Sequence, residues 1–335
     1  MKPVTILGAG SWGTALANLL AKKGHPVRLW SFEADVAAAI DAERENPRYL
    51  RGVRLDARIE AMTDVAAAVQ GADMLASVSP AQHVRTVMTA AAPHLEPHAD
   101  VVSASKGIEK GSLCTMAEVL EDVLPARTAR RASFLSGPSF AIEVARESAT
   151  AVTVASREAD AAERAQRLFQ TPYFRVYTSA DVIGVELGGA LKNVIAVAAG
   201  MVAGLGLGHN TTAALITRGL AEIARLAAAL GARPMTLSGL AGMGDLILTC
   251  TGDLSRNRHV GVELGRGRML EDILAEMQMV AEGVDTARAA LELARREGIE
   301  MPIVAEVHAV LFEGRTAAEA LENLMMREPK PELWR

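Results

Sequence analysis

The chain has 335 residues, of which 50% are hydrophobic and 22% charged, and its formal net charge is −5. This length and balance predict a globular protein large enough for two domains with separate cores. The negative charge, without a basic run interleaved with aromatic residues, argues against a nucleic-acid partner, so anionic substrates need local positive groups. The two cysteines, Cys114 and Cys250, form neither a disulfide framework nor a spaced metal pair. We therefore expect reduced thiols and no metal site.

The beginning of the chain and its longest apolar run bear on location. Residues 1–4 lead at once into a strand pattern, without the layout of a signal peptide. The apolar run over 194–207 is roughly 14 residues long, which is too short for a membrane span and is typical of a buried core helix. We therefore expect a cytoplasmic protein with no membrane span.

The first half of the chain alternates short apolar runs with helical patterns. A strand over 4–7 precedes a helix over 12–23, which Gly24 would end. This alternation predicts right-handed βαβ units and a parallel sheet, in which ligands bind beyond the carboxyl ends of the strands. The loops after the strands should therefore share one edge. The other predicted strands are 27–30, 74–78, 101–104, 134–135, 151–154 and 174–177, and the loops are 8–13, 31–33, 79–82, 105–109 and 136–141.

After about residue 180 the strand signals end and helical periodicity dominates. We place a domain boundary near Ser179, where Ser179 or Asp181 would cap the first helix of the second domain. The fold class is therefore α/β, with a parallel-sheet domain over 1–179 and an all-α domain over 180–335. The predicted helices of the second domain include 215–230, 269–279, 286–297 and 305–312.

The stretch GAGSWG at residues 8–13 lies between the first predicted strand and helix. Gly8, Gly10 and Gly13 have the spacing of a dinucleotide-binding fingerprint: the first allows a tight turn, the second lets a pyrophosphate approach, and the third lets helix and strand pack closely. The free N–H groups at the helix N-terminus favour the anion. The sequence therefore predicts a Rossmann-type domain; a glycine-rich turn without a ligand is the alternative.

The residues after the second strand should contact the ribose of the dinucleotide. An acidic residue about 20 positions after the fingerprint would bind the 2′-hydroxyl of NAD. Glu33 is the candidate, but it lies a little past the strand end, where its side chain could point to solvent. Arg48 is the alternative, because it could swing in toward the 2′-phosphate of NADP. The cofactor is therefore NAD or NADP, and both remain open.

Two lysines are candidates for catalysis. Lys106 follows a strand at the ligand edge and would contact an anion or a carbonyl group; a solvated surface charge is the alternative. Lys192 lies in VELGGALKNVIAVAAG, a helix that reads as buried almost all round. Because a buried ammonium is costly unless paired, this lysine suggests function. The alternative is a structural ion pair with Glu186 or Asp245.

The densest polar feature is GLAGMGDLILTCTGDLSRNRHVG at residues 239–261. Asp245 is a carboxylate in an otherwise apolar stretch. Ser255, Arg256 and Asn257 offer a hydroxyl, a guanidinium and an amide, a set that suits a phosphate dianion. A polar loop with Ser255 as helix N-cap is the alternative, and capping is compatible with phosphate binding.

Several of these stretches together resemble the bacterial NAD(P)-dependent glycerol-3-phosphate dehydrogenases along essentially the whole chain. The resemblance implies an oxidoreductase that moves a hydride reversibly between nicotinamide C4 and C2 of dihydroxyacetone phosphate or sn-glycerol 3-phosphate. It also implies a role in supplying glycerol 3-phosphate for phospholipid synthesis, and a homodimer is compatible with it. The matching stretches are GAGSWGTALA at 8–17, SKGIE at 105–109, SGPSFA at 136–141, LKN at 191–193, NTTAALITRG at 210–219, GLAGMGDLILTCT at 239–251, SRN at 255–257 and VAEGVDT at 280–286.

The resemblance also implies roles for individual residues. Lys192 would transfer the proton with Asp245 beside it, and Lys106 would contact both cofactor and substrate. The implied cofactor contacts are Gly8, Gly10, Ser11, Trp12, Gly13, Phe32, Tyr49, Lys106, Ala141, Arg256, Val280 and Glu282. The implied substrate contacts are Lys106, Gly137, Ser139, Lys192, Asn193, Asp245, Ser255, Arg256 and Asn257, of which the last three would hold the phosphate.

The chain departs from the family pattern at a few positions. Members often carry Arg or His near the end of the second strand, where this chain has Phe32 and Glu33. The adenine-side contact and the choice between NAD and NADP are therefore open. One rival interpretation is another two-domain dehydrogenase of the 6-phosphogluconate or ketopantoate type, against which the block at 239–257 argues. A second is a non-catalytic NAD(P)-binding regulator, against which the presence of Lys106, Lys192, Asp245 and Arg256 together argues.

Overall fold

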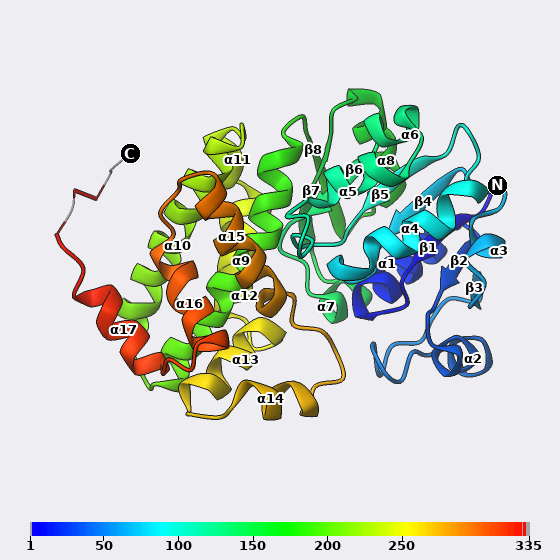
Figure 1. The fold of residues 1–335 in the computed structure, drawn as a ribbon. Helices are drawn as coiled ribbons and strands as arrows, with labels where there is room; N and C mark the ends of the chain where they lie inside the picture. The colour runs from blue at the N-terminus through cyan, green and yellow to red at the C-terminus, as the bar shows by residue number, and fades with distance from the viewer. Residues whose placement is uncertain (1, 330, 333–335) are drawn as a thin grey trace. The chain divides into compact units, whose positions relative to one another are not determined.

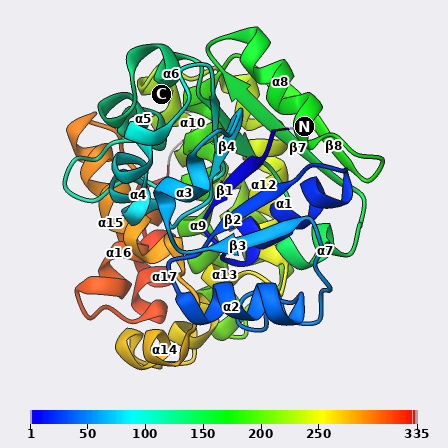
Figure 2. The same ribbon diagram turned by 90° about the vertical axis from the view of Figure 1, so that its right-hand side faces the viewer.

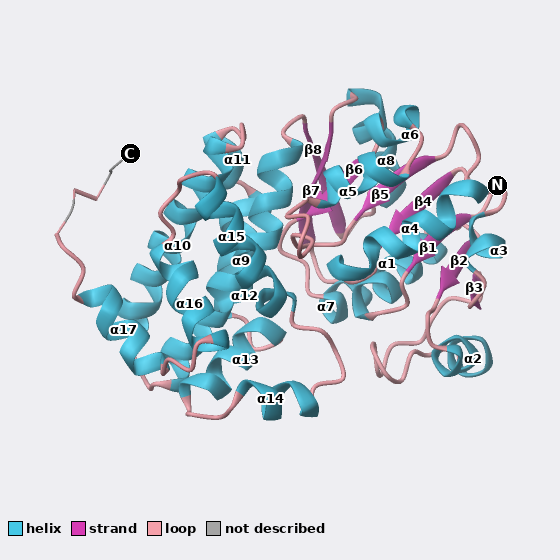
Figure 3. Cartoon of the chain, viewed as in Figure 1, coloured by secondary structure: helices cyan, strands magenta, loops and turns pink. Residues whose placement is uncertain are grey.

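The computed structural model describes residues 2–329 and 331–332. The chain forms two compact units: Met1–Lys106 with Cys114–Val185, and Gly107–Leu113 with Glu186–Arg335. Figure 3 shows the strands gathered in the first unit and helices in the second. The predicted boundary after Ser179 precedes the observed one, and the sequence did not predict that residues 107–113 belong to the second unit. There Lys110 forms an ion pair with Asp285 at 2.9 Å.

The first unit contains an eight-stranded sheet in the order β3-β2-β1-β4-β5-β6-β7-β8. Strands β1 to β6 pair in parallel, so their carboxyl ends lie along one edge, as the alternating pattern predicts. The strands are β1 Val4–Leu7, β2 Val27–Trp30, β3 Ile59–Met62, β4 Met74–Ser77, β5 Asp100–Ser103, β6 Ser133–Ser136, β7 Thr150–Ser156 and β8 Phe174–Ser179.

The helices of this unit form a layer on each face of the sheet. In Figure 2 the helices α3 to α6 lie on one side of the sheet and α1, α7 and α8 on the other. The core between the layers is mainly aliphatic, with Ile6, Leu20 and Leu29 fully buried. The helices are α1 Ser11–Lys22, α2 Ala34–Glu43, α3 Val65–Val69, α4 Val84–Ala91, α5 Met116–Val123, α6 Ala126–Arg130, α7 Ala141–Ala145 and α8 Ala159–Phe169.

Helix α1 begins and ends where the glycine pattern predicts. It starts after Gly10 and ends before Gly24, whose φ of +106° favours glycine. The N–H of His25 donates to Leu20 O at 3.1 Å, which closes the helix end. Between these ends Leu16, Leu20 and their alanine neighbours are buried.

Two features of the sheet differ from the prediction. Strand β7 pairs antiparallel with β6, because the segment between them contains only the short α7 and returns the chain at the same edge without a crossover. Strand β3 was not predicted, since its Ile-Glu-Ala-Met sequence contains a charged residue and a single β-branched residue.

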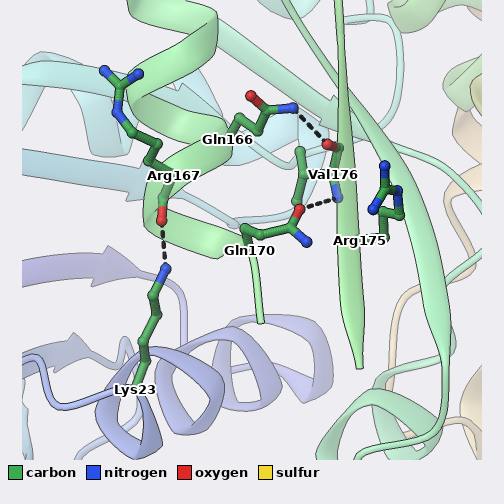
Figure 4. Close-up of a pocket in the computed structure, with 6 residues that line it drawn as sticks. All are labelled: Lys23, Gln166, Arg167, Gln170, Arg175 and Val176. Carbon is green, nitrogen blue, oxygen red and sulfur yellow. Dashed lines mark hydrogen bonds between the residues drawn. The ribbon is translucent and has the colours of Figure 1, made fainter. Parts of the chain in front are cut away.

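Two glutamines, one in α8 and one directly after it, bind the backbone of β8 at its outer edge. Gln166 donates from Nε2 to Val176 O at 2.7 Å, and Val176 N donates to Gln170 Oε1 at 2.9 Å (Figure 4). The two glutamines thereby occupy the N–H and C=O of Val176, which an added strand would otherwise use. These residues line a surface hollow with Lys23, Arg167 and Arg175. The cationic groups do not converge there, since Lys23 Nζ binds the carbonyl oxygens at the end of α8.

The second unit is helical, as expected (Figure 1). Helix α9 is buried nearly all round; it is long and apolar enough to cross a membrane, but 89% of its most apolar window lies inside the protein. Asp181 caps its start by accepting from Gly184 N at 3.0 Å. The helices are α9 Val182–Gly204, α10 His209–Ala229, α11 Pro234–Leu237, α12 Asp245–Thr251, α13 Arg256–Gly265, α14 Leu270–Glu276, α15 Glu282–Arg296, α16 Pro302–Phe312 and α17 Ala317–Met325.

Helices α9 and α13 cross in backbone contact through glycines. A Cβ on Gly200 would lie 2.1 Å from Arg258 O, and a Cβ on Gly261 would lie 2.0 Å from Val197 O. One turn further on, Gly204 and Gly265 repeat this approach. The four glycines therefore let the last turns of α9 and the second half of α13 pack in backbone contact.

A buried carboxylate joins α10 to α16. Glu222 is 3% exposed and accepts hydrogen bonds from Ile303 N at 2.8 and 3.1 Å and from Val304 N at 3.3 Å. These N–H groups lie at the start of α16, where no intrahelical acceptor is available. Burial raises the pKa of Glu222 from 4.5 to about 7, against the lowering effect of the two backbone donors.

We expect stability to depend on pH through Glu222. When the pKa of a group is higher in the folded than in the unfolded state, the group's contribution to stability is fully present below the unfolded-state pKa. This contribution is lost as the pH rises through the folded-state pKa. The free energy of unfolding should therefore fall, relative to Glu222→Gln, between about pH 5 and about pH 8, by at most about 3 kcal/mol. Denaturant unfolding of both proteins across this range measures the difference; a constant difference would contradict the raised pKa.

Candidate active site

The glycine loop between β1 and α1 leaves an open space at the start of the helix. Gly8 has a φ of +123°, and a Cβ there would lie 2.9 Å from the backbone of Val78. A Cβ on Gly13 would lie 1.8 Å from Gly8 O, whereas one on Gly10 would meet nothing within 4 Å. Gly8 and Gly13 thus serve close packing, and Gly10 leaves its surroundings open. This geometry, at a helix N-terminus, fits the pyrophosphate of a dinucleotide.

A neighbouring loop is fastened to the glycine loop. Asn46 Nδ2 donates to Ala9 O at 2.8 Å, and Ser11 Oγ donates to Tyr49 O at 2.6 Å. The predicted cofactor contact Trp12 packs against Phe174, with ring centroids 6.4 Å apart. Ser11 and Trp12 therefore have clear structural partners, and their contact with a cofactor stays a prediction.

The end of β2 carries one exposed ring and one carboxylate. The Phe32 side chain is 83% exposed. Glu33 Oε1 accepts a hydrogen bond from Tyr49 Oη at 2.6 Å. The Glu33 side chain is therefore turned toward the loop that is fastened to the glycines.

A second group of predicted residues lies at the ends of β5 and β6. Lys106 Nζ donates to Gly137 O at 3.4 Å, and Ser139 Oγ donates to the same oxygen at 3.0 Å. Gly137 has a φ of +141°, and a Cβ there would lie 2.9 Å from Val152 Cα. Ala141 begins α7 directly after this turn. The structure thus brings together the lysine, hydroxyl and turn that the sequence placed in two loops.

In the second unit a buried lysine is held by two side chains of α12. Lys192 is 7% exposed, and its Nζ lies 2.6 Å from Asp245 Oδ1 and 2.8 Å from Thr249 Oγ1. Thr249 in turn donates to Asp245 O at 2.6 Å. The ion pair with Asp245, one of the predicted alternatives, is therefore present. Thr249 was not predicted, although its position four residues after Asp245 on one helix face was a usable signal.

The approach of α9 to α12 depends on an irregular turn. Residues Leu240–Gly244 form a π-helical turn just before Asp245, a conformation frequent at functional sites. A Cβ on Gly188 would lie 2.6 Å from Ala241 O, so α9 touches this turn directly. Lys192 follows Gly188 by one helical turn and therefore faces the start of α12.

Asn193 and Asn257 brace three helices. Gly283 N donates to Asn257 Oδ1 at 2.8 Å, and Asn257 Nδ2 donates to Asn193 Oδ1 at 2.9 Å. Since a backbone N–H can only donate, these bonds fix the orientation of both amides. Both residues were predicted as substrate contacts; their observed contacts join α9, α13 and the start of α15. The part of Gly283 in this brace was not predicted.

The start of α13 presents donors on the surface of the second unit. Ser255 is buried and accepts from Arg258 N at 3.2 Å, which makes it the N-cap. The Arg256 side chain is exposed. Partial desolvation by the protein atoms around its guanidinium lowers the pKa of Arg256, and the negative charge of Glu282 acts in the opposite direction. Val280 is 45% exposed and Glu282 begins α15. Among residues 2–329 and 331–332, no group of three or more His, Cys, Asp or Glu side chains is placed to hold a metal ion.

The parallel sheet with its glycine loop, and the helical unit with its buried Lys192–Asp245 ion pair, define a dehydrogenase of the Rossmann class. Family models for the NAD-dependent glycerol-3-phosphate dehydrogenase N-terminus and C-terminus match residues 3–162 and 181–322. The chain belongs to the NAD-dependent glycerol-3-phosphate dehydrogenase family, and it is an oxidoreductase of this type that depends on NAD or NADP.

Individual relatives agree with this family. The chain is 56% identical to glycerol-3-phosphate dehydrogenase (NAD(P)+) from Geobacter metallireducens over 98% of both chains, and 54% identical to that of Myxococcus xanthus, also over 98% of both. The structure of the Coxiella burnetii glycerol-3-phosphate dehydrogenase matches with a TM-score of 0.93 at 39% identity, covering 97% of this chain and 99% of that one. A ketopantoate reductase from Ralstonia eutropha, at 18% identity and a TM-score of 0.60, shares the fold alone.

Proposed function

We propose that the chain interconverts dihydroxyacetone phosphate and sn-glycerol 3-phosphate. The observation that carries the proposal is the buried Lys192, paired with Asp245 and Thr249, in a member of this family. The family relationship supports a role in phospholipid precursor synthesis in the cytoplasm. A homodimer is also compatible with it, and gel filtration with light scattering would test that state.

Lys192 is the proposed proton donor in the reductive direction. The glycine loop would hold the dinucleotide, which would supply the hydride when bound. Negative charge then grows on the substrate carbonyl oxygen, and a positioned ammonium both stabilises this charge and delivers the proton. Asp245 and Thr249 fix the direction of the ammonium. Lys106, which lies beside Gly137 at the ends of β5 and β6, keeps its proposed role as a cation that contacts the cofactor and the substrate.

The start of α13 is the proposed phosphate site. The exposed guanidinium of Arg256 can bind two phosphate oxygens, and the first free N–H groups of the helix add further donors. Asn257 serves by bracing this helix start against α9 and α15, so that the phosphate contacts keep a fixed place relative to Lys192. Contacts to the phosphate, remote from the reacting carbon, supply binding energy that orients the substrate.

Arg256→Ala tests the phosphate site. We expect kcat/KM for dihydroxyacetone phosphate to fall about 10- to 100-fold, because a hydrogen bond to a charged group is lost. Activity toward unphosphorylated dihydroxyacetone should change much less. Arg266→Ala, at the far end of the same helix, removes an equal charge as the matched control. Equal losses on both substrates would exclude Arg256 from the phosphate site.

A further inference from the structure

The structure bears on which dinucleotide the glycine loop accepts. This inference rests on the proposed function, because it concerns the cofactor of that reaction. In folds of this kind the group after the second strand contacts the adenosine ribose, where NAD has a 2′-hydroxyl and NADP a 2′-phosphate. The relevant side chains of this chain are those of Phe32, Glu33, Arg48 and Tyr49.

The carboxylate of Glu33 has a fixed position. Glu33 is the N-cap residue of α2, yet its side chain does not cap that helix. It accepts from Tyr49 Oη at 2.6 Å instead. Burial and the neighbouring carboxylate raise the pKa of Tyr49 to about 12, so the phenol remains a donor at neutral pH. Glu33 Oε2 remains available to accept a further hydrogen bond.

Tyr49 is in turn tied to the glycine loop. Its carbonyl oxygen accepts from Ser11 Oγ at 2.6 Å, and its N–H donates to Asn46 Oδ1 at 3.0 Å. Asn46 also donates to Ala9 O and to Thr14 Oγ1. The carboxylate therefore belongs to the same hydrogen-bonded network as the glycine loop, which fixes its position relative to that loop.

Arg48, the alternative group for a 2′-phosphate, already lies near a carboxylate. Its Nη1 lies 3.7 Å from Asp35 Oδ2, and its guanidinium carbon lies 5.4 Å from the centroid of the Tyr49 ring. A phosphate would have to replace this carboxylate partner while lying beside a second one, Glu33. Phe32 adds an exposed apolar ring that can stack on adenine, which both dinucleotides share.

We propose that Glu33, held by Tyr49, selects NAD(H) over NADP(H) in this chain. Its free oxygen accepts a hydrogen bond from the ribose 2′-hydroxyl, whereas its charge repels a 2′-phosphate. In this account Tyr49 is a positioning residue and Phe32 contributes to affinity for both dinucleotides without affecting the choice.

Binding measurements on the full chain test this selection. We expect isothermal titration calorimetry to give a dissociation constant for NADH about tenfold or more below that for NADPH, from the repulsion of a unit charge and a phosphate dianion about 6 Å apart in water. Glu33→Gln should tighten NADPH binding about tenfold. It should also weaken NADH binding, because the ribose 2′-hydroxyl loses a charged acceptor. Thermal melting of the variant shows that it folds.

Two further variants separate charge from stacking. Glu43→Gln removes an equal charge at the far end of α2 and should leave the ratio of the two dissociation constants unchanged. Phe32→Ala should weaken both dinucleotides by a similar factor. The proposed selection of NAD(H) is wrong if the wild-type protein binds NADPH as tightly as NADH, or if Glu33→Gln leaves the ratio of the two dissociation constants unchanged. Either result leaves the proposed function intact. Binding of neither dinucleotide overturns the proposed function as well.

Discussion

Lys192→Met lowers kcat for the reduction of dihydroxyacetone phosphate about 10²- to 10⁴-fold, the usual contribution of a positioned acid or base. Methionine has a similar length but has neither the proton nor the charge. Dinucleotide binding should be unchanged, because the glycine loop belongs to the other unit. Initial rates, followed by the absorbance of the reduced nicotinamide, measure the loss.

The stability of this variant needs its own control. Loss of the ammonium leaves Asp245, which is 1% exposed, without its partner at 2.6 Å. Breaking a buried pair from one side costs about 3–5 kcal/mol. The double variant Lys192→Met, Asp245→Asn removes both charges, so it should recover much of this stability and none of the turnover. Recovered turnover would show that Lys192 acts only as the structural partner of Asp245.

Gly261→Ala lowers the free energy of unfolding by about 3 kcal/mol, at the upper end of the usual cost of overpacking. Its methyl group would lie 2.0 Å from Val197 O and 2.9 Å from Gly200 Cα, which are backbone atoms of α9 and cannot turn aside. The variant can fold only if α13 moves away. That movement separates Asn257 from Asn193, so kcat/KM should also fall. Denaturant unfolding and the same rate assay measure both effects.

Gly208→Ala is the matched control in the same unit. Gly208 precedes α10, and a Cβ there would meet nothing within 4 Å. Its substitution should cost about 1 kcal/mol or less, the range for loss of a good N-cap residue. If Gly261→Ala unfolds at the same denaturant concentration as Gly208→Ala, the two helices do not depend on backbone contact.

Much of the fold could be predicted because local chemistry determined it. The apolar runs, the glycines around α1 and the all-round apolar pattern of α9 each indicate one structure. The direction of β7 could not be predicted, because it depends on how the chain returns after β6 and not on the strand residues. The assignment of residues 107–113 to the second unit likewise rests on long-range contacts such as that of Lys110 with Asp285.

The site was predictable as a set of residues, and less so as a network. A lysine in an apolar helix and an aspartate in an apolar stretch were both visible, and they meet at 2.6 Å. The hydrogen bonds that join Asn193, Asn257 and Gly283 could not be predicted from the sequence, because a side-chain amide can bind a ligand as well as another part of the protein. The glycine spacing of GMVAG at 200–204 and GVELG at 261–265 was an available signal for the crossing of α9 and α13.

The most direct test of the central claim is the reaction itself. Purified protein is mixed with dihydroxyacetone phosphate and NADH, and the loss of reduced-nicotinamide absorbance is compared with the sn-glycerol 3-phosphate formed. We expect one molecule of sn-glycerol 3-phosphate for each NADH oxidised. Absence of turnover with both NADH and NADPH, in protein that is folded and binds a dinucleotide, would contradict the account.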